Sequence, residues 1–229
     1  MIKNIINIGI PSKGRLRADI LKIFKKNKLN LVSERGERDL LGSIKNLPNI
    51  KMLYLHAREI VERLGDGSLD IGFSGYDLLK ESEINIQKKI NVVKKYRFGK
   101  ATLVVAIPDP WIDVQTIADL EEIAFEFKDK KKKRLRVGTK YPNLTREFLF
   151  SKGVTQFKLV NSLGSTEVMP FTGSAEIIVD ITSTGETIKA NNLRVLKDGE
   201  ILKSEACMMV SKSASKNIAF KKIVKLLSK

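Results

Sequence analysis

Residues 177–187 read IIVDITSTGET, and this stretch indicates the class of fold. An apolar run ends in Asp180, after which small hydroxyl residues and Gly185 lead into a helix expected near residues 187–191. A strand that continues through a polar loop into a helix is the building unit of α/β proteins. In open α/β sheets, ligands bind at the carboxyl ends of the strands. The stretch therefore predicts an α/β fold with a binding loop at this edge.

The same alternation of apolar runs and helical spacings recurs along the chain. We expect strands at residues 5–10, 52–55, 69–73, 92–96, 101–107, 135–138, 157–160 and 176–180. We expect helices from residue 16 onward, around residues 60–64, from an Asp113 cap through residue 127, and at residues 142–152, 187–191 and 218–227. The opening βαβαβ pattern predicts a parallel, buried sheet.

The order of these elements predicts two α/β lobes. We expect residues 1–97 and 196–229 to form the first lobe and residues 98–195 the second, with the chain crossing near Arg97. Residues 193–196 and 206–210 are typical of a hairpin or a return strand. A length of 229 residues suits one large domain or two small lobes.

The charge of the chain is its strongest compositional signal. Lys and Arg number 42 against 26 Asp and Glu, which gives a formal charge of +16. Such a charge suits nucleic acid, an acidic membrane surface or polyanionic small substrates. The densest basic run, residues 130–134, lies between a predicted helix and a predicted strand, where we expect a solvated loop.

Composition and hydropathy exclude several other classes. One Cys and one His cannot build a disulfide within the chain or a Cys/His zinc cluster. No apolar run approaches the ~20 residues of a membrane span. The N-terminal stretch 2–10 has no small-residue cleavage site, so we expect a cytoplasmic protein that does not bind a membrane. The sequence shows neither cations interleaved with exposed aromatic residues nor a groove-reading motif, so we expect no nucleic-acid binding.

The loop after Asp180 has the chemistry of a phosphate site. Its backbone N–H groups and hydroxyls are donors for a phosphate, and Asp180 can accept hydrogen bonds from sugar hydroxyls. The alternative is an ordinary strand-to-helix turn with capping Thr residues. The loop lacks the Gly-Lys-Ser/Thr ending of a Walker loop. It resembles the 5-phosphoribosyl 1-pyrophosphate (PRPP) loop of phosphoribosyltransferases, although Ile181 stands where many of those have a second acid.

Two cations, Lys13 and Arg15, follow the first predicted strand at the same functional edge. They are either anion ligands or solvated residues at the start of a helix. Arg58 opens the next helix, where a cation faces the helix dipole unfavourably, and an anionic ligand would account for it.

Five ordered motifs make a wider resemblance specific. They are PSKGRL at 11–16, LDIGFSGYDL at 69–78, TKYPNLTR at 139–146, LGSTE at 163–167, and the loop 180–187 with NNL at 191–193. In this order they resemble the ATP phosphoribosyltransferase family, which catalyses the first step of histidine biosynthesis. The resemblance implies two lobes of the type II periplasmic-binding-protein fold, with the active site in the cleft between them.

The implied reaction is that of a pentosyltransferase. It joins N1 of the ATP adenine to C1 of PRPP, releases pyrophosphate and needs no enzyme nucleophile. Mg²⁺ is the implied cofactor, carried by the substrates, and we expect no metal ligand from the protein.

The resemblance also assigns residues to roles. The implied PRPP ligands are Asp180, Thr182, Ser183, Thr184, Gly185, Glu186, Thr187 and Glu167, and the implied catalytic cations are Lys13, Arg15, Arg58 and Arg38. The implied ATP-binding residues are Gly75, Tyr76, Asp77, Lys140, Tyr141 and Arg35. Arg35 and Arg38 are equal candidates for one loop arginine. For Glu167, an acid placed at the start of a helix is an equally good explanation. For Tyr76 and Tyr141, a buried ring is an equally good explanation.

The chain length resembles the short, catalytic form of the family. This form works with a regulatory subunit that resembles a histidyl-tRNA synthetase, which implies a hetero-oligomer and a homodimer when alone. Two further classes compete with this interpretation. A solute-binding protein would share the lobes but needs a signal peptide, and a nucleic-acid binder needs exposed aromatic residues among its cations or a groove-reading motif.

Overall fold

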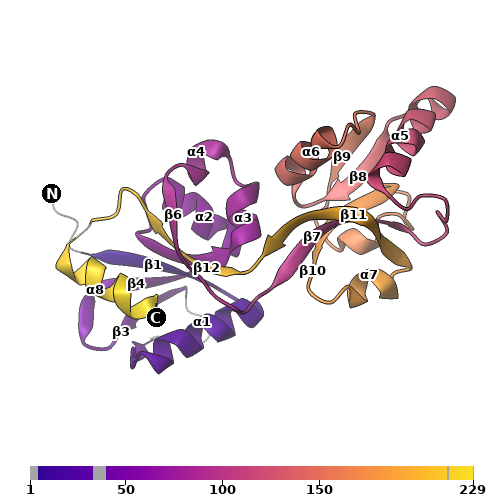
Figure 1. Ribbon diagram of the computed structural model, residues 1–229. Coiled ribbons are helices and arrows are strands. Elements are labelled where there is room, and N and C mark those ends of the chain that lie inside the picture. Colours follow the sequence, from indigo (N-terminus) through magenta and orange to yellow (C-terminus); the bar gives the residue numbers. More distant parts are fainter. Residues whose placement is uncertain (1–4, 33–39, 216, 229) are drawn as a thin grey trace. The chain divides into compact units, whose positions relative to one another are not determined.

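The chain leaves one structural unit and later returns to it (Figure 1). The computed structural model describes residues 5–32, 40–215 and 217–228. The first unit comprises Met1–Gly99 and Glu205–Lys229, and the second comprises Lys100–Ser204. The return lies later than the sequence boundary at residue 196 because strand β11 (Leu193–Ser204) keeps pairing with β7 (Ala101–Pro108) as far as Ser204.

A seven-stranded sheet forms the first unit, in the order β2-β3-β4-β1-β5-β12-β6. Its strands are β1 (Ile6–Pro11), β2 (Leu31–Val32), β3 (Leu41–Ile44), β4 (Leu47–Leu55), β5 (Ile71–Gly75), β6 (Ile90–Lys95) and β12 (Ala206–Ser211). The expected parallel sheet is correct only for β4, β1 and β5. It is wrong for the flanking strands because a hairpin adds β3 and β2 on one side, and β12 and β6 are antiparallel on the other.

Helices cover both faces of this sheet. They are α1 (Gly14–Lys26), α2 (Ala57–Gly65), α3 (Tyr76–Glu81), α4 (Ile84–Gln87) and α8 (Ile218–Leu227). One hydrophobic core joins α1 and α8 to β1 and β5. In it the rings of Phe24 and Phe73 pack edge to face, with their centroids 5.8 Å apart. The other face packs against α2, where a Cβ at Gly72 would lie 2.5 Å from Ile60, so glycine permits this close approach.

A five-stranded sheet forms the second unit, in the order β11-β7-β10-β8-β9. Its other strands are β8 (Leu135–Thr139), β9 (Phe157–Asn161) and β10 (Ile177–Thr182), and its helices are α5 (Ile117–Lys131), α6 (Pro142–Ser151), the short 3₁₀ helix η2 (Thr166–Val168) and α7 (Glu186–Ala190). Strand β8 is parallel to both β9 and β10, so all three carboxyl ends share one edge.

Two expectations about local structure are corrected. Helix α5 is capped by Thr116 and not by Asp113, because Thr116 and Asp119 form a reciprocal capping box. Of the two alternatives for residues 193–196 and 206–210, the hairpin is wrong and the return strand is confirmed, since β11 and β12 belong to different sheets and the chain returns between them. None of the helices within residues 5–32, 40–215 and 217–228 has both the length and the apolar composition needed to cross a membrane.

Candidate active site

The loop between β10 and α7 is held by its own hydroxyl groups. Gly185 N donates to Thr182 Oγ1 at 2.9 Å, and Glu186 N donates to Thr184 Oγ1 at 3.4 Å. Gly185 has a φ of +78°, a conformation that glycine adopts without strain. Within the described residues, the backbone N–H groups of Ser183, Thr184 and Thr187 have no acceptor. The loop therefore presents three amide donors beside exposed hydroxyls.

Asp180 lies just before this loop, near the carboxyl end of β10. Burial raises the pKa of its carboxyl, while the Ile181 N–H, which donates to it at 2.8 Å, Lys140 and the Thr166 side chain act in the opposite direction. Glu167 raises the pKa further by repulsion. Asp180 is therefore a half-buried acceptor with a cation and a hydroxyl beside it.

The structure brings together candidates from three separate segments of the second unit. Lys140 follows β8, Glu167 lies in η2, and Asp180 lies near the carboxyl end of β10, yet the charges of Lys140 and Glu167 both act on Asp180. The pairing of Val179 with Thr139 explains this, because it places the ends of the parallel strands β10 and β8 side by side. Tyr141 differs, since its ring is buried at 6% exposure.

The sequence pattern did not single out Thr166 as a functional residue. Its side chain is fully buried, its hydroxyl donates to Ser162 Oγ at 3.0 Å, and it lowers the pKa of Asp180. The LGSTE motif contains Thr166, but the charged Glu167 beside it is the more conspicuous polar group there.

The first unit holds a second set of candidates. Lys13 and Arg15 follow β1, and Arg58 lies in the first turn of α2, directly after β4. Ser12 N donates to Leu55 O at 2.8 Å, which ties the carboxyl ends of these two parallel strands together. The three cations therefore share one edge of the sheet. His56 caps α2, because its Nδ1 accepts a hydrogen bond from Arg58 N at 3.4 Å.

Gly75 ends β5, and Tyr76 and Asp77 follow it at the same edge. A Cβ on Gly75 would overlap Asp77 Oδ1, and Asp77 is only 6% exposed, so the carboxylate fills the space that glycine leaves. Lys95 Nζ lies 3.7 Å from the centre of the Tyr76 ring. No local pattern signals Lys95, because it reaches this edge through the pairing of β6 with β12.

Two candidate arginines, Arg35 and Arg38, lie outside the described residues, so the choice between them stays open. In the part of the chain that the structure describes, no three His, Cys, Asp or Glu side chains group in a way that could hold a metal ion. The carboxylates of Asp180 and Glu167 form a pair near the hydroxyl loop.

The fold and the loop define the class as two-unit α/β proteins of the periplasmic-binding-protein type. The arginine-, lysine-, histidine-binding protein ArtJ from Geobacillus stearothermophilus shares this fold with a TM-score of 0.55 and 12% identity, over 96% of this chain and 88% of that chain. The ATP phosphoribosyl transferase (HisG:HisZ) complex from Thermotoga maritima is more similar, with a TM-score of 0.74 and 27% identity over 97% of this chain and 95% of that chain.

Curated relatives narrow this class to one family. An ATP phosphoribosyltransferase of Nitrobacter winogradskyi is 45% identical over 90% of this chain, and the chain spans 64% of that protein's length. An ATP phosphoribosyltransferase of Mesorhizobium japonicum is 41% identical over 91% of this chain and 90% of its own length. The family model described as HisG, ATP phosphoribosyltransferase, matches residues 56–229, and the chain belongs to this family.

Proposed function

We propose that the chain is the catalytic subunit of a short-form ATP phosphoribosyltransferase. The lone pair of adenine N1 in ATP attacks C1 of PRPP, the bond from C1 to pyrophosphate breaks, and pyrophosphate leaves with the bonding electrons. This is the first step of histidine biosynthesis, and its substrates lead us to expect a cytoplasmic enzyme. Family membership supports the reaction, and the similarity to a chain of the Thermotoga maritima HisG:HisZ complex supports a subunit that works with a separate partner.

The observation that carries the proposal is the donor loop after Asp180. Ser183, Thr184 and Thr187 offer backbone N–H groups that have no acceptor within the described chain, which suits the 5-phosphate of PRPP. Asp180 would accept hydrogen bonds from the ribose hydroxyls. The phosphate and the sugar would then be fixed at neighbouring points, which orients C1 for attack.

A divalent cation fits the donor set beside this loop. Asp180 and Glu167 offer the hard oxygen ligands that Mg²⁺ prefers, and Mg²⁺ commonly combines one or two carboxylates with substrate phosphates. When bound, it would neutralise the charge that develops on the departing pyrophosphate. Asp180 and Glu167 also repel each other, so a cation between ligand and carboxylates would relieve that repulsion.

The cations Lys13, Arg15 and Arg58 would neutralise phosphate charge from the first unit. All three share the edge formed by the ends of β1 and β4, and Lys13 and Arg15 are exposed there. The stretch Gly75 to Asp77, with Lys95 over the Tyr76 ring, would serve ATP. Charged groups that are already in place stabilise the charge that develops in the transition state, because they need not reorganise during the reaction.

We also propose a regulatory partner. The similar Thermotoga maritima structure is a HisG:HisZ complex, which supports a hetero-oligomer. From the family resemblance we expect the second subunit to resemble a histidyl-tRNA synthetase and the chain alone to form a homodimer.

The test is pyrophosphate release from ATP and PRPP with Mg²⁺, with and without a co-expressed synthetase-like partner. The proposal predicts release that requires both substrates and is faster with the partner. A lack of release under both conditions, with a folded chain, would refute the enzyme assignment.

A further inference from the structure

A pocket lined mainly by charged residues lies in the second unit, away from the Asp180 loop. Its volume is about 390 Å³, and its lining residues are Phe127, Lys131, Lys133, Arg134, Arg136 and Glu176. Four of these six residues are cations and one is an acid. The pocket includes part of the basic run 130–134, which the sequence pattern predicted to be only a solvated loop.

The pocket lies at the edge opposite the proposed PRPP loop. Arg134 directly precedes β8 and Glu176 directly precedes β10, and these two strands are parallel. Lys140 and Asp180 lie at the other end of the same strands. At a rise of about 3.3 Å per residue, the two edges are on the order of 15 Å apart. A ligand in the pocket would therefore not occupy the PRPP loop.

The cations of the run divide into two groups. Lys130 pairs with Glu126 at 3.0 Å and Lys132 with Asp129 at 3.7 Å, and both pairs lie along the surface of α5. Lys131, Lys133 and Arg134 line the pocket, and none of them has a carboxylate partner within the described residues. The unneutralised charge thus lies on the pocket side.

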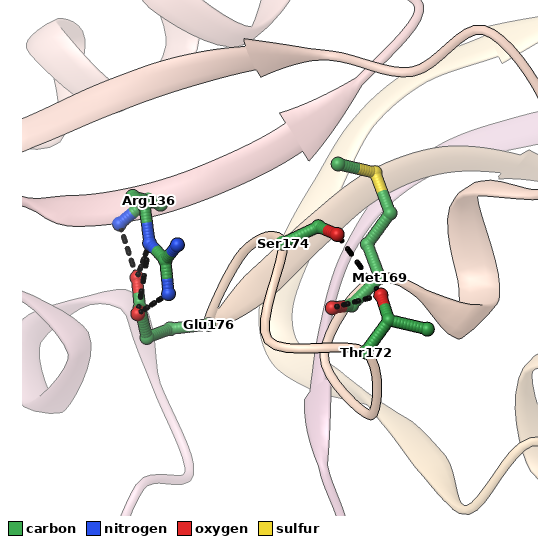
Figure 2. A network of polar contacts seen from close by, with 5 residues as sticks. All are labelled: Arg136, Met169, Thr172, Ser174 and Glu176. Carbon is green, nitrogen blue, oxygen red and sulfur yellow. Dashed lines mark hydrogen bonds and ion pairs between the residues drawn. The ribbon is translucent and has the colours of Figure 1, made fainter.

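Arg136 and Glu176 form an ion pair that still leaves donors of Arg136 available to an anion. Figure 2 shows the guanidinium facing the carboxylate, with Arg136 Nη2 donating to Glu176 Oε1 at 2.6 Å and Arg136 Nε at 3.0 Å. The same carboxylate accepts from the Arg136 backbone N–H at 2.6 Å. Glu176 is therefore fully engaged, and the outer Nη1 of Arg136 has donors left for a ligand.

Neither the dipole of α5 nor nucleic acid binding accounts fully for these cations. The negative end of α5 favours Lys131 in its last turn, but Lys133 and Arg134 lie beyond the helix. Nucleic acid binding would use an open aromatic face for base stacking, and Lys131 Nζ lies over the Phe127 ring at 3.7 Å.

We propose that this pocket binds the phosphate group of a small phosphorylated metabolite, at a site separate from the substrate loop. Three cations without a carboxylate partner would attract the negative charge of a phosphate monoester, and the forked donors of Arg134 with the remaining Nη1 donors of Arg136 suit its oxygens. The volume of the pocket leaves room for the organic part of the metabolite.

The test is a titration of the full chain with inorganic phosphate at constant ionic strength, followed by amide chemical shifts. We expect saturable shifts at residues 131–136 and 176. Lys133→Gln with Arg134→Gln should weaken this binding about tenfold or more, because two charge-assisted contacts are lost. The matched control is Lys130→Gln with Lys132→Gln, which removes the same charge from the same run but outside the pocket.

Three further arms complete the test. Ribose 5-phosphate should bind at these residues at least as tightly as inorganic phosphate, and a short single-stranded oligonucleotide should bind more weakly than ribose 5-phosphate. Asp180→Asn should leave the binding unchanged, which separates this site from the proposed function. No saturable shift at residues 131–136, equal weakening by the two double variants, or tighter binding of the oligonucleotide would overturn the proposal.

Discussion

Thr182 and Gly185 close the loop between β10 and α7, because Gly185 N donates to Thr182 Oγ1 at 2.9 Å. This bond links the last residue of the strand to the residue that caps the helix. The intervening amides of Ser183 and Thr184 have no acceptor in the described chain. The donor loop thus exists before a ligand arrives.

The first prediction concerns Thr182→Val, which keeps the shape of the side chain and removes the acceptor. We expect PRPP affinity, measured by calorimetry, to fall about tenfold, because part of the binding free energy must then be used to order the loop. Thr172→Val is the control, because Thr172 uses its hydroxyl in another turn of the same unit, where it donates to Met169 O at 3.2 Å (Figure 2). Equal loss of PRPP affinity in the two variants would contradict this role of the loop.

The second prediction is that Asp180→Asn weakens PRPP binding and stabilises the fold. Burial raises the pKa of Asp180, so wild-type stability falls as the pH rises from the ordinary Asp pKa of about 3.9 through the raised value. Asn does not ionise and avoids this loss. At pH 7 we expect the melting temperature to rise by a few degrees and PRPP affinity to fall about tenfold or more.

Calorimetry across pH checks the stability part of this prediction. The difference in melting temperature between Asp180→Asn and wild type should shrink as the pH is lowered toward 4, since the wild-type carboxyl then becomes neutral. A variant that melts below wild type at pH 7, or that binds PRPP normally, would contradict the role assigned to Asp180.

The sequence predicted the strand, loop and helix around Asp180 well because these elements depend on local patterns. The apolar run before Asp180 and the hydroxyls around Gly185 lie within one short stretch, and the strand, loop and helix fall there as expected. Lys95 is different, because only the pairing of Cys207 with Lys95 across β12 and β6 brings it near Tyr76. Contacts that depend on long-range strand order leave no local signal.

In the sheet of the first unit, too, the strand order was predictable where it follows from local patterns and was not where it depends on long-range pairing. The strands β1, β4 and β5 alternate with helices, and that alternation predicts their parallel order. Strand β12 comes from the returning chain and pairs antiparallel with β5, which the spacing of apolar residues cannot indicate. Strand β3 joins β4 through a tight hairpin at Asn46, whose φ is +66°. A lone Asn without a following Gly is a weak turn signal.

The third prediction concerns Gly75→Ala. The new methyl group would overlap Asp77 Oδ1 and force the buried carboxylate to move. We expect a loss of roughly 1–3 kcal/mol in the free energy of unfolding and weaker ATP binding. Gly164→Ala is the control, because no atom lies within 4 Å of its added Cβ and its φ is not positive. Unchanged stability and ATP affinity in Gly75→Ala would show that Asp77 is not held there.

The fourth prediction concerns Cys207, whose side chain is almost fully buried. Burial raises the pKa of its thiol to about 12; Lys95 opposes this shift, and Glu205 and Asp77 add to it. Since the thiolate is the reactive form, the native protein should react with an aromatic disulfide reagent at least ~100-fold more slowly than the unfolded protein at pH 8. Unfolding in guanidinium should release one reactive thiol. Fast reaction of the native chain would contradict the observed burial.

The most direct test of the proposed function is the identity of the product. The chain, combined with its regulatory partner, ATP, PRPP and Mg²⁺, should form ATP that carries a phosphoribosyl group on adenine N1, detected by mass spectrometry, with one pyrophosphate released per adduct. Asp180→Asn should reduce both signals equally at low PRPP. Pyrophosphate without adduct, or neither product from a folded complex, would contradict the claim that this chain joins ATP to PRPP.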